Sequence, residues 1–364
     1  MKKESVRSSS SSSGRIRRWL LFLLLSFALF VTFTFGLRLI RKYNRKVRNS
    51  PSRKAARKAK IHLEPTSSPL PSSQYSVPSH VHYIFGMEPT FGHMSFGLMH
   101  YISILGTVLY IKPERISWHH RFLPNASENV WWSCAQKHVM PREVGDVTMV
   151  HGRFIPSMHV AHKADILRMQ IMREEGGIYV DSDVIPLRSF DELRRLAGNK
   201  LVMGKEEAAG QSGMANAVLV GAPNSSFINR WWEHYKDFEG TKGCWACHSV
   251  LLPKRLAGEH PEEIVILGPN TFFRPTWAEL KPLYEIDDQY DYIDNFAVHL
   301  WTSQEAKSYN RLTKLAPADV WSGKGSFHRV ARRVLADAAA AGLLCDAAKK
   351  DMPINPPREK VGRG

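Results

Sequence analysis

The chain has 364 residues, of which 43% are hydrophobic and 23% charged, a balance typical of a globular protein with a sizeable core. Its net charge of +16 lies entirely in residues 1–60, which hold 17 Lys and Arg against one acid, while the rest of the chain holds 33 residues of each sign. Because a nucleic-acid-binding protein needs its basic surface on the folded domain, this distribution argues against nucleic acid as a partner.

The first feature along the chain is an apolar stretch. Residues 19–37 contain no charged side chain, and arginines stand at both ends. A helix of that length, with a rise of about 1.5 Å per residue, just crosses a hydrocarbon layer. A cleaved signal peptide would have a shorter apolar region ending in small residues, whereas "GLRLIRKY" follows here. The sequence therefore predicts a cytoplasmic tail over residues 1–18 and a transmembrane anchor over 19–37.

A stem is expected next. Residues 38–78 are first basic and then rich in Ser and Pro, with too few large apolar residues to fold alone. Six Lys or Arg precede the span and eleven follow it by residue 60, so the positive-inside count does not orient it. Glycosylation sequons at Asn125 and Asn224 and an even number of cysteines, four, favour a lumenal domain.

The folded body is expected over residues 79–335, with a partly disordered tail over 336–364. Strands and helices alternate along it, which predicts an α/β fold. The expected strands are 80–87, 147–152, 178–180, 200–206 and 216–223, and the expected helices are 92–106, 157–176 and 226–238.

The stretch "EEGGIYVDSDV" contains the main chemical signal. Residues 178–180 read as a central parallel strand covered on both faces, and ligands of such sheets bind beyond the carboxyl ends of the strands. If the backbone stays extended there, Asp181 and Asp183 point to one side. Two close carboxylates favour a divalent cation such as Mg²⁺ or Mn²⁺, held together with substrate phosphates. Without its surroundings, the triplet could equally be a solvated turn or a helix cap.

The surroundings are more specific. "HKADILRMQIMREEGGIYVDSDVIPL", residues 162–187, resembles the sugar-binding region of the DXD-containing glycosyltransferases, above all family 32, which includes Golgi mannosyl-, α-galactosyl- and α-N-acetylglucosaminyltransferases. The resemblance continues more loosely over residues 80–302 through "ANAVLVGAP", "GPNTFF" and "AVHLW". It implies a GT-A-like nucleotide-diphospho-sugar transferase fold and a single-pass type II protein of the Golgi or ER membrane.

The resemblance also implies roles for individual residues. Asp183 resembles the acid that binds the metal directly, Asp181 the acid nearer the ribose and sugar, and His299 the histidine that completes the metal site. A purely structural role for His299, and a plain intrahelical salt bridge between Asp165 and Arg168, remain alternatives. The implied donor-binding residues are Lys163, Asp165, Arg168, Tyr179, Asp181 and Trp301.

The expected reaction moves a sugar from a UDP- or GDP-sugar to a glycan, glycoprotein or glycolipid. The departing diphosphate gains negative charge, which Mn²⁺ or Mg²⁺ would stabilise with help from Lys163 or Arg168. The resemblance implies retention at the anomeric carbon. The alternative is a non-catalytic anchored binding module with the same fold. Candidates to flank the reacting carbon are Glu206, Glu207, Gln211 and, favoured because it matches the family's Asn-Ala position, Asn216.

The cysteines leave several interpretations. Residues 244–248 fit C-x-x-C-H, a haem-attachment pattern, although no suitable axial methionine is evident. Cys134 with His138 could contribute to a zinc site. We favour plain disulfides, either within the pair Cys244 and Cys247 or from it to Cys134 or Cys345.

Overall fold

The computed structural model describes residues 75–91, 95–242, 244–286, 290–308, 310–357, 359 and 361. The predicted tail, the predicted span at 19–37 and nearly all of the predicted stem lie outside these residues. Among the helices within the described ranges, none combines the length and the apolar character that a bilayer crossing requires.

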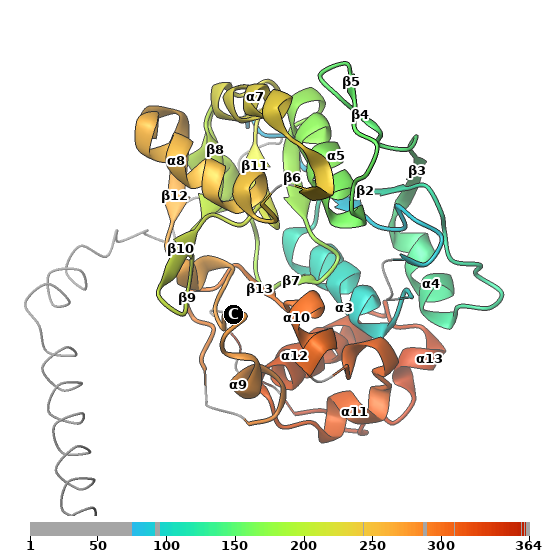
Figure 1. Ribbon diagram of the computed structural model, residues 1–364. Helices are drawn as coiled ribbons and strands as arrows, with labels where there is room; N and C mark the ends of the chain where they lie inside the picture. The colour runs from blue at the N-terminus through green and yellow to red at the C-terminus, as the bar shows by residue number, and fades with distance from the viewer. Residues whose placement is uncertain are drawn as a thin grey trace, which may run out of the picture. The chain divides into compact units, whose positions relative to one another are not determined.

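A seven-stranded sheet forms the centre of the fold (Figure 1). Its strand order is β12-β8-β11-β6-β1-β2-β3. The strands are β1 (His80–Ile84), β2 (Arg115–His120), β3 (Met140–Glu143), β6 (Gly177–Val180), β8 (Leu201–Gly204), β11 (Val218–Gly221) and β12 (Ile264–Leu267).

The sheet is mixed. β1 runs parallel to β2 and β6, but β11 runs antiparallel to both β6 and β8. The predicted strand at 178–180 is central and buried on both faces, as expected. The prediction that it lies in a parallel sheet is correct for its β1 side and wrong for its β11 side. The α/β class is confirmed.

Helices cover both faces of the sheet, because alternate strand residues point to opposite sides. Val180 packs in a cluster with residues of α3 (Leu98–Gly106), α6 (Asp191–Ala197) and α12 (Ser326–Ala340). Tyr179 packs in a second cluster with residues of α5 (Val160–Glu174), α7 (Ser226–Glu233) and α8 (Leu252–Glu259). The two clusters form a core on each face of the sheet.

Within the described residues, three two-stranded pairs lie outside the main sheet. β4 (Met149–Val150) pairs with β5 (Arg153–Phe154), and β9 (Glu206–Ala208) pairs with β10 (Gln211–Gly213). β7 (Val184–Pro186) pairs antiparallel with β13 (Ala297–His299) and places His299 opposite Val184. This last pair brings a late segment of the chain to the end of β6.

The connection from α5 into β6 depends on two glycines with positive φ, Gly176 at +61° and Gly177 at +98°. A Cβ at Gly177 would lie 2.5 Å from the carbonyl oxygen of His80 on neighbouring β1. Only glycine combines this backbone conformation with so close an approach. The Gly-Gly pair therefore ends α5 and lets β6 enter the sheet directly.

The packed part extends beyond the boundaries expected from the sequence. Val77, assigned to the stem, is fully buried. α12 continues to Ala340, past the expected domain end at 335, and Cys345 forms a disulfide with Cys134. Ala348 is buried as well, so the described part of the segment from 336 belongs to the fold and is not a separate tail. The other α-helices in the described part of the chain are α4 (Val130–Ala135), α9 (Leu280–Tyr284), α10 (Thr302–Ser308), α11 (Pro317–Ser322) and α13 (Asp346–Lys349).

Several histidines are buried and neutral. Burial, assisted in most cases by nearby positive charge, lowers their pKa values from 6.5 to between about 2 and about 4. They are His80, His82, His100, His119 and His328.

Candidate active site

The two acidic residues of the motif lie in a turn at the carboxyl end of β6. The backbone N–H of Val184 donates to the carbonyl of Asp181 at 3.0 Å, which closes a four-residue turn. The condition of an extended backbone, under which strand alternation would point both carboxylates to one side, is therefore not met. The turn nevertheless brings the carboxylates of Asp181 and Asp183 to one place, because the chain folds back into β7.

A histidine completes this cluster. Nε2 of His299 lies 3.3 Å from Oδ1 of Asp183, and one ligand atom from each of Asp181, Asp183 and His299 lies within 4.8 Å of the others. Pairing of β7 with β13 explains this proximity, since His299 stands opposite Val184. The structure thus brings together all three residues expected to hold a metal.

Asp183 is fixed by a residue that the sequence did not single out. Its Oδ2 accepts hydrogen bonds from the backbone N–H of Thr302 at 3.0 Å and from the Thr302 hydroxyl at 2.8 Å. Burial alone would raise the pKa of Asp183, but His299 and these bonds outweigh it and hold the pKa well below its usual range. The string "TSQE" has the spacing of a helix start, yet that signal predicts a cap and gives no hint of a contact with Asp183.

The pKa values of His299 and Asp181 are both raised, but for different reasons. Burial lowers the pKa of His299, but the neighbouring Asp183 outweighs it, so the pKa of His299 lies above its ordinary value. Burial raises the pKa of Asp181, and Asp183 adds to this effect. A site that perturbs the pKa values of three clustered groups is a good candidate for function.

Arg168 supplies positive charge beside Asp181. Its Nη2 lies 3.2 Å from Oδ1 of Asp181, and its guanidinium carbon lies 4.6 Å from the centre of the Tyr179 ring. The Tyr179 hydroxyl donates to the same Asp181 oxygen at 2.5 Å. Asp181 is therefore held by two of the predicted donor-binding residues.

Asn216 holds Asp165 and Arg168 in place through two hydrogen bonds. Its Nδ2 donates to Oδ1 of Asp165 at 2.8 Å, and its Oδ1 accepts from Nη1 of Arg168 at 2.9 Å. Arg168 also contacts Asp165 at 3.4 Å, so the predicted intrahelical salt bridge is present. With only 7% of Asn216 exposed, both ends of its amide are occupied by buried charged partners.

Two other predicted donor residues have protein partners of their own. Lys163 donates to Asp146 at 2.7 Å, and Asp146 also pairs with Arg121 at 3.0 Å. The indole N–H of Trp301 donates to the carbonyl of Pro275 at 2.9 Å, while its ring centre lies 4.0 Å from that of His299. Trp301 thus forms part of the wall next to His299.

The other three residues expected to flank the reacting carbon, Glu206, Glu207 and Gln211, lie on the β9–β10 pair and differ in exposure. Glu206 is half-buried and accepts from the indole N–H of Trp277 at 2.8 Å, and burial raises its pKa. Glu207 is also half-buried, whereas Gln211 is exposed. The charge of Glu206 also contributes to the raised pKa of His299.

The cysteines are all in disulfides, Cys134 with Cys345 and Cys244 with Cys247. The haem and zinc interpretations are therefore wrong, because no thiol is left to attach a haem or to bind zinc. Of the disulfide pairings expected, the one within the C-x-x-C pair is correct.

Two further groups of metal-ligating side chains occur among the described residues, and neither suits a metal-diphosphate. In the first, Glu175 next to His80 already pairs with Arg142 at 2.7 Å and Arg115 at 3.5 Å, whose charges oppose a cation. The second comprises His260, Glu262 and Glu263, and Arg230 already contacts Glu263 at 2.7 Å.

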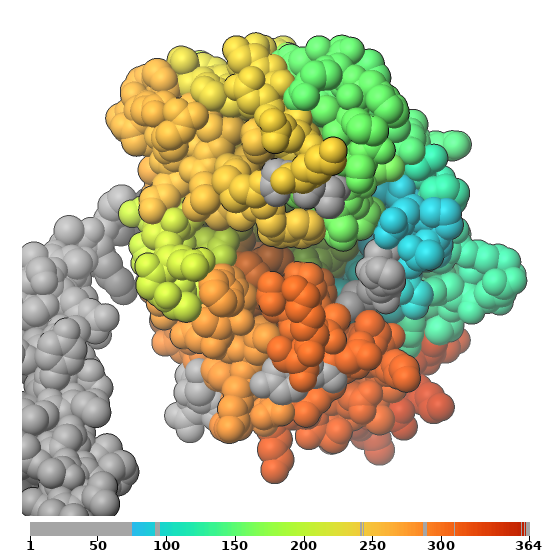
Figure 2. Space-filling model, viewed as in Figure 1, coloured from blue at the N-terminus to red at the C-terminus, as the bar shows by residue number. Residues whose placement is uncertain are grey.

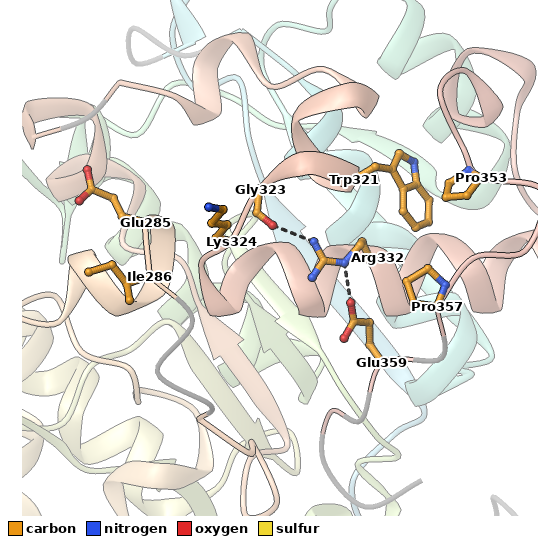
Figure 3. Close-up of a pocket in the computed structure, with 9 residues that line it drawn as sticks. All are labelled: Glu285, Ile286, Trp321, Gly323, Lys324, Arg332, Pro353, Pro357 and Glu359. Carbon is orange, nitrogen blue, oxygen red and sulfur yellow. Dashed lines mark hydrogen bonds and ion pairs between the residues drawn. The ribbon is translucent and has the colours of Figure 1, made fainter.

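A cavity of about 840 Å³ lies elsewhere, beside α12 and the segment after α13 (Figure 3). Arg332 in this cavity donates to the carbonyl of Gly323 and to Glu359, so its charge is already compensated. No predicted donor or metal residue lines it.

A second depression lies elsewhere on the surface. Figure 2 shows that the surface is hollowed between the yellow segments and the orange segment containing α10. Asp183 of the metal cluster bonds to Thr302, the first residue of α10.

Sequence comparisons agree with this geometry. Residues 119–200 match the family described as glycosyltransferase sugar-binding region containing DXD motif. The chain is also 33% identical over 266 residues to "Glucan organizing enzyme 1" of Cryptococcus neoformans var. grubii serotype A, an alignment covering 70% of each protein. The chain belongs to the DXD-containing glycosyltransferases. It is accordingly an enzyme that transfers sugar residues.

Solved glycosyltransferases are also similar to this one. The galactosyltransferase LgtC, in complex with donor and acceptor sugar analogs, is 13% identical with a TM-score of 0.39, covering 73% of this chain and 100% of its own. The glycosyltransferase GlyE of Streptococcus pneumoniae TIGR4 is 10% identical with a TM-score of 0.42, covering 76% and 66% respectively. Because both scores lie below 0.5, the family assignment rests on the sequence matches.

Proposed function

We propose that this glycosyltransferase is dependent on Mn²⁺ or Mg²⁺, has a GT-A-like fold, and transfers a sugar from a UDP- or GDP-sugar to a glycan, glycoprotein or glycolipid. The observation that carries the proposal is the convergence of Asp181, Asp183 and His299 at the carboxyl end of β6. Ligands of α/β sheets bind at this edge.

The donor atoms of this cluster fit such a metal. Carboxylate oxygens are the preferred ligands of Mg²⁺ and Mn²⁺, and an imidazole is compatible with a transition metal such as Mn²⁺. Asp183 is almost wholly ionised at neutral pH, since its pKa is held low by His299 and Thr302. A bound divalent ion would supply positive charge where the departing diphosphate becomes more negative.

The chain's own residues complete the charge balance. Arg168, whose side chain is only 6% exposed, supplies a cation fixed by Asp165, Asn216 and Asp181. In a buried site such a preorganised charge stabilises a developing negative charge without further reorganisation. We place the donor sugar against Asp165 and Arg168, and its diphosphate beside Asp181 and Asp183. Transfer with retention at the anomeric carbon is part of the proposal.

The enzyme is further proposed to be a single-pass type II protein of the Golgi or ER membrane, anchored by residues 19–37, with the catalytic domain in the lumen. Two disulfides support an oxidising compartment. Both sequon asparagines, Asn125 and Asn224, are exposed and could accept a glycan. Carbonate extraction of membranes and endoglycosidase treatment test these two assignments, and an unglycosylated protein released by carbonate would contradict them.

The catalytic proposal is tested by release of nucleotide from UDP- and GDP-sugars with Mn²⁺ or with EDTA. We expect release that depends on the metal and that Asp183→Ala abolishes, because that variant loses a metal ligand. Glu262→Ala, in a competing cluster, is the matched control and should keep full activity. Metal-independent release, or equal loss in both variants, would show that the cluster at Asp183 is not the metal site.

A further inference from the structure

The disulfide loop between Cys244 and Cys247 presents an aromatic residue at the surface. Trp245 stands between the two cysteines and is 58% exposed, so a large part of its amphipathic ring is accessible to a ligand. The disulfide closes a ring of four residues, and such a short ring restricts the positions that the indole can take. Trp245 is therefore an exposed aromatic side chain on a constrained loop.

This loop packs against the helix that carries the donor residues. The Trp245 ring centre lies 4.9 Å from that of His159, the N-cap residue of α5, and 4.8 Å from that of His162 in its first turn. His162 precedes Asp165 by three residues, so the two side chains are neighbours on one face of α5. The indole thus lies about one helical turn from the proposed donor-sugar residue.

His162 is an unusual member of this group. It is only 3% exposed, yet neither of its ring nitrogens has a hydrogen-bond partner among the described residues. A buried donor or acceptor without a partner costs free energy, and such groups in native proteins call for an explanation. A ligand hydroxyl bound at the edge of the Trp245 ring would supply the missing partner.

The loop is also connected to the other side of the donor site. Val250, which follows the disulfide, accepts a hydrogen bond from the backbone N–H of Met214 at 3.1 Å. Two residues later, Asn216 holds Asp165 and Arg168. In Figure 2 yellow segments, the colour of this part of the chain, border the hollow opposite the orange segments. The loop that carries Trp245 is thus connected through Val250 and Met214 to the segment in which Asn216 holds Asp165 and Arg168.

We propose that Trp245 and His162 form the binding site for the acceptor saccharide. The indole provides a flat apolar surface for a sugar ring, and a His162 nitrogen hydrogen-bonds a sugar hydroxyl. An aromatic surface combined with a few polar groups is the usual composition of a small-molecule site. This assignment rests on the proposed function, because it is the neighbouring donor that makes the bound saccharide an acceptor.

The test measures binding and catalysis separately, using the full-length chain in detergent. Binding of short linear gluco-, manno- and galacto-oligosaccharides is followed by saturation-transfer NMR in the absence of donor. We expect the wild type to bind at least one series, and Trp245→Ala to bind it about tenfold more weakly, as loss of one aromatic contact with its buried area implies. Leu251→Ala, which removes another exposed side chain nearby (48% exposed), is the matched control and should bind like the wild type.

A second variant separates binding from folding. His162→Phe keeps an aromatic ring and removes both unpartnered nitrogens, so the protein should be at least as stable as the wild type while binding the oligosaccharide more weakly. Donor hydrolysis without acceptor should remain unchanged in the control variant Leu251→Ala. Lack of binding by the wild type to all three series, or wild-type affinity in Trp245→Ala, would overturn the acceptor assignment. Failure of the proposed function would instead appear as absence of metal-dependent nucleotide release from the wild type.

Discussion

The role of Asn216 can be decided by replacing it with alanine. The substitution removes the bond to Asp165 at 2.8 Å and the side-chain bond to Arg168 at 2.9 Å, and it leaves the bond from Arg168 to the backbone carbonyl of residue 216 at 2.7 Å. A hydrogen bond to a charged group contributes about 1.5 to 3 kcal/mol. Because the two bonds share one network and are not additive, we expect the free energy of unfolding to fall by about 3 kcal/mol.

Asn229→Ala is the matched control. Asn229 likewise accepts from an arginine, Arg173, at 3.0 Å and donates to a backbone carbonyl at 3.1 Å, but it is half-exposed. Water can replace these partners, so we expect a loss of about 1 kcal/mol or less. Urea denaturation of the full-length chain in EDTA gives both values by linear extrapolation. Equal losses in the two variants would refute the conclusion that Asn216 holds a buried charged network.

Activity measurements extend the same comparison. If Asn216 positions Arg168, the alanine variant should lose catalytic efficiency for the donor, because a misplaced cation no longer stabilises the departing diphosphate. Asn216→Asp offers a further check, since a third carboxylate beside Asp165 and Asp181 would oppose donor binding more strongly than alanine does. Asn229→Ala should have wild-type kinetics. Full activity of both Asn216 variants would show that this residue is dispensable for positioning and for chemistry.

Three further outcomes are expected. Thr302→Val removes the hydroxyl hydrogen bond to Asp183. Because residues that orient a metal ligand typically contribute a factor of about ten or more to metal affinity, this variant should bind Mn²⁺ about tenfold more weakly in isothermal titration. The control Thr313→Val should bind Mn²⁺ like the wild type. Gly177→Ala should lower the free energy of unfolding, measured by urea denaturation, by more than its control Gly152→Ala. Both glycines have positive φ, and we expect roughly 1 kcal/mol of strain for Gly152→Ala. Only at Gly177 would the added Cβ also collide with a backbone oxygen, that of His80. The unfolding free energy measured in EDTA should fall as pH decreases from about 6.5 towards 4, since the unfolded chain protonates the five histidines whose pKa values burial lowers to about 4 or below before the folded state does. Each contributes up to about 1.4 kcal/mol per pH unit, and His328→Gln should reduce the slope. A pH-independent stability over this interval would contradict the last prediction.

The sequence alone determined the α5–β6 unit and its acidic end. An apolar repeat at helical spacing, a Gly-Gly stop and a short apolar strand are local patterns, so the helix, the central strand and the place of Asp181 and Asp183 followed from them. The family resemblance added His299 and Arg168, which the structure places around the same carboxylates.

Only the tertiary structure decided how distant segments meet. The turn at Asp181, the contact of Thr302 with Asp183 and the direction of β11 depend on which strands pair, and one strand's local pattern does not specify its partner or its direction. The pairing of Cys134 with Cys345 likewise required their separate segments to pack together, since cysteine spacing leaves several pairings possible. For the same reason the approach of Trp245 to His162 could not be read from the sequence, because nothing local relates the disulfide loop to the first turn of α5.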